Sequence, residues 1–165
     1  MASDSKIVRL LKKLTAVRST DEYADEFPQH IEKPSSIGKG VPTLQKNVYR
    51  QPTPMIRERF KYAGRWENPF VGMTWLSVSD MKSLWTDERA QEMVQVTRKY
   101  WENSAPALHS NKELSMFGWD PDEMDELYLV WHDDKKREPQ VVWYRAQRED
   151  WYENLQEYVE FIAGD

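Results

Sequence analysis

The 165-residue sequence contains no cysteine, only three histidines and only six glycines. The absence of cysteine excludes disulfide bonds, thiol nucleophiles and metal or iron–sulfur sites that need thiolate ligands. The histidines form no HxH or HExxH pattern, and neither a Gly-x-Ser-x-Gly nor a phosphate-binding glycine motif occurs. We therefore expect no enzyme, no metal and no cofactor, although catalytic residues assembled from distant positions would leave no such motif.

A long apolar run is also missing. Apolar side chains in the first 17 residues are spaced as in a helix and interrupted by Lys and Arg, unlike the continuous apolar segment of a signal peptide. No stretch approaches the roughly 20 apolar residues that a membrane-spanning helix needs. These features predict a cytoplasmic protein without membrane contact.

The charge of the chain is unevenly distributed. Hydrophobic residues make up 39% and charged residues 31%, which predicts one globular domain over residues 1–165. Residues 1–72 hold 13 basic and 8 acidic side chains (+5), whereas residues 73–165 hold 10 basic and 20 acidic ones (−10), which sum to the net charge of −5. The acidic part favours a basic partner.

Hydrophobic spacing predicts an α+β fold with a mostly antiparallel sheet, packed by amphipathic helices. Helical spacing occurs at residues 7–17 and again at 151–162. Residues 28–72 hold six of the nine prolines and four of the six glycines, which predicts loops and short edge strands. Residues 74–78 predict a strand, residues 80–103 one or two helices, and the strands expected at 114–118, 127–132 and 141–145 form a meander near the C-terminus.

The most acidic segment, DPDEMDE at residues 120–126, has five acids and no base. It is not a calcium loop, because Met124 and Asp125 occupy the positions where an EF-hand has an oxygen donor and a glycine. Two interpretations stay open: a solvated turn, or a surface that steers a basic protein partner, with Trp119 as an anchor. The candidate partner-binding residues, of which the last two belong to the next turn, are Trp119, Asp120, Asp122, Glu123, Asp125, Glu126, Asp133 and Asp134.

A basic stretch with interleaved aromatic residues spans residues 39–66 and contains a single acid, Glu58. This combination is typical of proteins that bind single-stranded nucleic acid. The simpler interpretation is that these cations pair with acids of the same molecule. The candidate residues for the alternative, nucleic-acid-binding function are Arg50, Arg57, Arg59 and Lys61.

Residues 73–163 resemble the SUKH superfamily, which includes bacterial toxin-immunity proteins and fungal regulators. The resemblance rests on the strands and acidic turn in FGWDPDEMDELYLVW, the strand after a proline in EPQVVWYR, the closing helix in LQEYVEFI, and the strand and helix in MTWLSVSDMKSLW. It implies an α+β fold, no catalytic activity, and binding to a protein, commonly a toxin domain, whose active site is blocked. We therefore expect a non-enzymatic immunity-type or regulatory protein that binds another protein, such as a basic toxin or nuclease domain.

Overall fold

A seven-stranded antiparallel sheet lies at the centre of the protein, whose computed structural model describes residues 3–145 and 148–164. From β4 onward, every strand of this sheet pairs with the next one along the chain. In spatial order the strands are β1 (His30–Ile31), β4 (Trp66–Glu67), β5 (Thr74–Trp75), β6 (Leu114–Asp120), β7 (Asp125–Val130), β8 (Gln140–Arg145) and β9 (Arg148–Tyr152). This arrangement confirms the predicted α+β fold with a meander toward the C-terminus.

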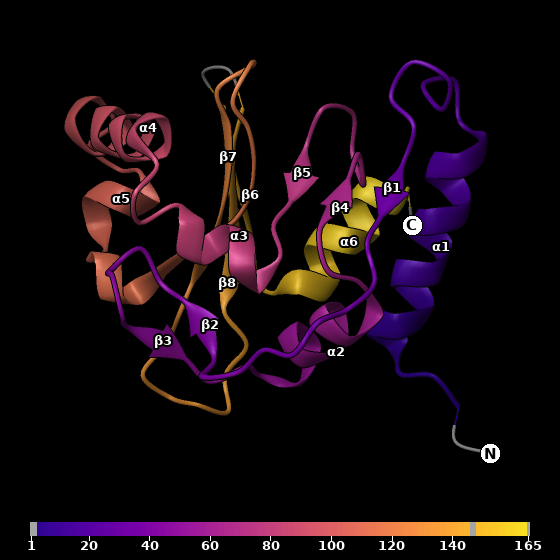
Figure 1. Ribbon diagram of the computed structural model, residues 1–165, viewed down its shortest axis with the longest axis horizontal. Coiled ribbons are helices and arrows are strands. Elements are labelled where there is room, and N and C mark those ends of the chain that lie inside the picture. The colour runs from indigo at the N-terminus through magenta and orange to yellow at the C-terminus, as the bar shows by residue number, and fades with distance from the viewer. Residues whose placement is uncertain (1–2, 146–147, 165) are drawn as a thin grey trace.

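Helices lie on both sides of the sheet (Figure 1). Figure 1 shows α1, α2 and α6 on one side of β6–β8, and α4 and α5 on the other. The helices are α1 (Lys6–Thr20), α2 (Pro54–Tyr62), α3 (Val78–Ser83), α4 (Glu88–Tyr100), α5 (Ala105–Leu108), α6 (Leu155–Ala163) and the 3-10 helix η1 (Asn111–Glu113). Because both faces of the central strands are covered, side chains on either face of β7 are buried.

Both terminal helices begin at a capping residue, and α6 also ends at one. Ser5 accepts a hydrogen bond from the backbone N–H of Val8 at the start of α1, and Asn154 accepts one from Glu157 at the start of α6. Gly164 adopts a left-handed conformation, with φ of 74°, and ends α6. The apolar face of α6 packs on the sheet, as its spacing predicts, with the Tyr158 ring 5.8 Å from that of Trp143.

Residues 28–72 contain four two-residue strands, which agrees with the short strands expected there, but β4 lies between β1 and β5 and is not an edge strand. Two of them, β2 (Val41–Pro42) and β3 (Tyr49–Arg50), form a separate small sheet. The segment also contains α2, which the sequence pattern did not predict. Arg59 occupies a buried position of this helix beside Ile56 and Phe60, and a charged residue there interrupts the apolar pattern.

Candidate protein-binding site

The acidic segment forms the turn between β6 and β7, and one of its acids builds the turn itself. Asp120 Oδ1 accepts hydrogen bonds from the backbone N–H groups of Asp122, at 3.1 Å, and Glu123, at 3.3 Å. Its other oxygen lies against Gly72, where an added Cβ would come within 2.5 Å. Asp120 is 7% exposed, so its inclusion in an exposed partner surface is corrected: its carboxylate orders the turn.

The tip of this turn is exposed to solvent. Asp122, Glu123 and Met124 are exposed, whereas Asp125 and Trp119 are half-buried, and Trp119 packs against the core. Arg89 on α4 donates to the carbonyl of Pro121 at 2.7 Å and lies 3.7 Å from the carboxylate of Asp122. These contacts place the tip of the turn beside α4.

The last two candidate acids do not join this surface. Asp133 and Asp134 are exposed, but they lie in the connection between β7 and β8, at the opposite end of β7 from the acidic turn (Figure 1). Asp133 lies 3.9 Å from Arg50, on the side of the small β2–β3 sheet. The structure therefore divides the predicted acidic surface between two ends of the sheet.

Glu126 is buried on the side of β7 that α4 covers, with 4% of its surface exposed. The prediction that it belongs to an exposed acidic surface is therefore also wrong. Its carboxylate accepts hydrogen bonds from the hydroxyl of Thr97 on α4, at 2.7 Å, and from the hydroxyl of Tyr128 on the same strand. Burial raises the pKa of Glu126 from 4.5 to about 7, although both hydroxyl groups favour the charged form. Burial also raises the pKa of Tyr128 well above 10, so this hydroxyl remains a donor.

A cavity of about 200 Å³ opens beside the Glu126 carboxyl group. Its mouth is apolar, because Val96 is 42% exposed and Met124 is 51% exposed. Tyr144 also lines the cavity, and its hydroxyl group donates to Glu149 at 2.6 Å and accepts from the backbone N–H of Ala105 at 3.1 Å. The residues that line the cavity around Glu126 come from α4, from the position directly after α4, from the acidic turn and from β8. They are Met93, Val96, Thr97, Trp101, Met124 and Tyr144.

The basic stretch does not form one continuous surface. Arg59 is fully buried, and its guanidinium group donates to the carbonyls of Ala63 (2.6 Å), Gly64 (2.9 Å) and Leu76 (3.2 Å). The prediction that Arg59 binds nucleic acid is therefore wrong, because a buried side chain with these partners does not reach a ligand. Arg50 donates to the carbonyl of Lys112 at 3.0 Å.

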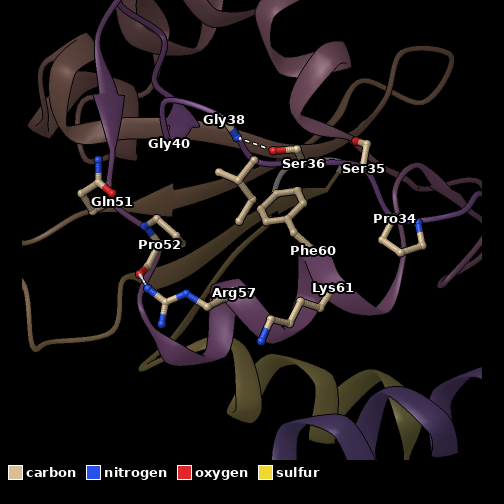
Figure 2. Close-up of a pocket in the computed structure, with 11 residues that line it drawn as sticks. Pro34, Ser35, Ser36, Gly38, Gly40, Gln51, Pro52, Arg57, Phe60 and Lys61 are labelled. Atoms are coloured by element: carbon tan, nitrogen blue, oxygen red, sulfur yellow. Dashed lines mark hydrogen bonds between the residues drawn. The ribbon is translucent and has the colours of Figure 1, made fainter.

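Arg57 and Lys61 remain as exposed cations on α2, beside a second cavity of about 510 Å³ (Figure 2). Arg57 donates to the carbonyl of Pro52 at 3.2 Å, and Lys61 lies 3.9 Å from Glu58. The Phe60 ring in the wall of this cavity is 3% exposed, so it presents little area for a base to stack on.

Within residues 3–145 and 148–164, no group of three or more acidic or histidine side chains is arranged to hold a metal ion. None of the described helices has both the length and the apolar character needed to traverse a bilayer. The chain matches no family model, no curated protein and no solved structure.

Proposed function

We propose that this protein is a non-enzymatic binding module that recognises a basic protein partner and blocks it, as an immunity or regulatory protein does. The binding region is the turn surface, defined as Val96, Tyr100, Asp122, Glu123 and Met124. The observation that carries this proposal is that two exposed carboxylates lie at the same turn as the exposed side chain of Met124, next to Val96. An apolar centre with a charged rim is the usual composition of a protein interface.

The two kinds of side chain have different roles in this proposal. Asp122 and Glu123 attract a basic partner and orient it during approach, a contribution that salt weakens. Val96 and Tyr100 lie one helical turn apart on α4, and Tyr100 is 68% exposed, so contact with a partner removes apolar area from water. The immunity-type assignment rests on the resemblance of residues 73–163 to the SUKH superfamily and on the excess of acids after residue 72.

The test is affinity capture from the native lysate with tagged protein, at low and high salt and with nuclease treatment, followed by mass spectrometry. Three baits are compared: the wild type, Asp122→Lys with Glu123→Lys, and a control with Glu22→Lys and Asp25→Lys. The control makes the same charge change at two exposed acids that follow α1. We expect one stoichiometric basic protein with the wild type and the control, reduced at high salt and lost with the turn variant.

Equal capture by the wild type and the turn variant would contradict the proposed surface. The captured protein is then purified, and its own activity is measured with increasing amounts of the wild-type protein. Inhibition at one-to-one stoichiometry supports the blocking role, and full activity in the complex contradicts it.

The alternative function, nucleic-acid binding through residues 39–66, is favoured by the two exposed cations beside the second cavity. It predicts that nuclease abolishes the recovered material. It also predicts that Arg57→Glu with Lys61→Glu prevents recovery, whereas the turn variant does not, because phosphate contacts depend on cations.

A further inference from the structure

The carboxyl group of Glu126 has no cationic partner within the described chain. Its two hydrogen-bond donors, Thr97 and Tyr128, are neutral hydroxyl groups. Among the charged groups nearby, Asp125 further raises the pKa of Glu126. A buried carboxylate without a counter-charge is costly, and a cation at the cavity would offset this cost.

The cavity beside Glu126 has the size and the walls of a pocket for one side chain. At about 200 Å³ it is smaller than the roughly 300–1,000 Å³ of typical cofactor and drug-sized sites. Trp101 and Tyr144 contribute aromatic rings, which attract cations, and Met93 and Met124 contribute flexible thioethers that adapt to an alkyl chain. The lining therefore combines mostly apolar side chains and two hydroxyl groups with a single carboxyl group.

The hydrogen bonds of Glu126 favour an ammonium group over a guanidinium group. Oε2 accepts from Thr97 and Oε1 accepts from Tyr128, so each carboxylate oxygen already has a donor. A guanidinium group binds carboxylates best through two parallel hydrogen bonds, which here would require the remaining lone pair of both oxygens to point into the cavity. An ammonium group is a compact charge that needs a single remaining lone pair.

We propose that this cavity is the anchor pocket of the turn surface and takes one lysine side chain of the partner protein. The alkyl stem contacts Val96 and Met124 at the mouth, and the ammonium group meets Glu126. Asp122 and Glu123, exposed at the same turn, draw the cation toward the pocket. This inference rests on the proposed function, because it identifies the partner side chain that the turn surface binds.

The test uses N-acetyl-lysine methylamide as a probe, with the full-length protein labelled at the methionine methyl groups and observed by NMR. N-acetyl-norleucine methylamide is the uncharged control ligand, and N-acetyl-arginine methylamide tests the choice of cation. We expect saturable shifts of the Met93 and Met124 methyl resonances with the lysine probe, and binding weaker by roughly tenfold or more with norleucine.

Glu126→Gln keeps the shape of the side chain and removes the charge; its amide oxygen accepts from one of the two hydroxyl groups, and its amide nitrogen donates to the oxygen of the other. We expect it to weaken lysine-probe binding by roughly tenfold or more, whereas Glu22→Gln, which neutralises an exposed acid that follows α1 and lies outside the turn surface, changes it by less than about twofold. Equal binding of lysine and norleucine, wild-type binding by Glu126→Gln, tighter binding of arginine, or the absence of any shift would each overturn the proposal.

Binding of the lysine probe also depends on pH, because only ionised Glu126 supplies the charge. The other titratable or charged groups around it are Asp125 and Tyr128 on β7, Tyr144 on β8, Glu149 on β9 and Arg98 on α4. We expect tighter binding at about pH 8 than at about pH 5.5, and the same difference for Glu22→Gln but not for Glu126→Gln.

The two proposals fail in different experiments, because the lysine probe requires no partner protein. A partner that is lost from the turn variant but binds Glu126→Gln as it binds the wild type would overturn the anchor pocket and leave the proposed function standing. Binding of the lysine probe, with no partner protein captured from the lysate, would overturn the proposed function and leave a lysine-binding pocket at Glu126.

Discussion

Arg59 and Glu126 are both buried ionisable side chains, and the protein surrounds them differently. Arg59 on α2 meets three backbone carbonyls and lies 5.5 Å from the ring of Trp75 and 5.4 Å from that of Phe117. Glu126 on β7 meets two hydroxyl groups and borders a cavity with an exposed mouth. A buried charge whose partners are all groups of its own chain stabilises the packing of those segments, whereas a buried charge that borders a cavity is available to a ligand.

Burial moves the two pKa values in opposite directions, since it disfavours the charged form of each group. It lowers the pKa of Arg59 from 12.5 to about 9, so the guanidinium group remains charged at neutral pH. It raises the pKa of Glu126 to about 7, so this carboxyl group changes charge near neutral pH. Arg59 therefore belongs to the framework of the fold, whereas the change of charge of Glu126 near neutral pH supports its proposed role in binding.

The largest effect is expected for Arg59→Met. This change leaves the carbonyls of Ala63, Gly64 and Leu76 without their donor, which should cost about 3–5 kcal/mol in the free energy of unfolding. Urea denaturation measures the loss. Arg57→Met, two positions away and exposed on the same helix, should change stability by less than about 0.5 kcal/mol. Equal effects of the two substitutions would break the contrast between an enclosed charge and a surface charge.

Glu126→Gln should change how stability depends on pH. Because the pKa of Glu126 is higher in the folded state, the folded protein holds its proton more tightly. The resulting stabilisation is complete below about pH 4.5 and is lost as pH rises through about 7. The shift from 4.5 to about 7 corresponds to about 3 kcal/mol.

Glutamine stays neutral throughout, so Glu126→Gln should match the wild type at about pH 4 and exceed its stability at about pH 8. Urea denaturation at both values tests this, with Glu123→Gln as the exposed control. If the free energies of unfolding of the wild type and Glu126→Gln changed with pH in the same way, burial would not raise the pKa of Glu126.

A smaller effect is expected at Glu138, which lies between β7 and β8 and caps α2 from a distant part of the chain. Its carboxylate accepts from the hydroxyl of Thr53, at 2.5 Å, and from the backbone N–H of Met55, at 3.3 Å. Thr53 forms no side-chain cap of its own, so Glu138→Ala should destabilise the protein by about 1 kcal/mol.

Thermal unfolding of Glu138→Ala compares this half-buried charge with the two buried ones. Asp133→Ala removes an exposed acid from the same connection and should leave the melting temperature nearly unchanged. If Glu138→Ala lost as much stability as Arg59→Met, the stability contribution of these charged side chains would not follow how deeply each is buried.

Several elements could be predicted from local patterns because their apolar spacing is unbroken. Leu10, Leu11 and Leu14 are buried on α1 as predicted, and the strands β6, β7 and β8 follow the predicted meander. The sequence pattern did not predict strand β9. Trp151 was expected to be the first apolar residue of the last helix, but it lies in β9 and pairs with Val142 of β8. Three charges in REDWY hide this strand, which is recognisable only beside its partner.

The sequence by itself determined which residues alternate, which helices are amphipathic and which chemistries are missing, because these are properties of neighbouring residues. Tertiary structure alone decided which acids reach solvent. Asp122 and Glu123 are exposed at the tip of the turn, whereas Glu126, three residues later, is buried because α4 packs over β7. The same packing brings Met93, Trp101 and Tyr144 around its carboxyl group, and no local pattern joins residues so far apart in the chain.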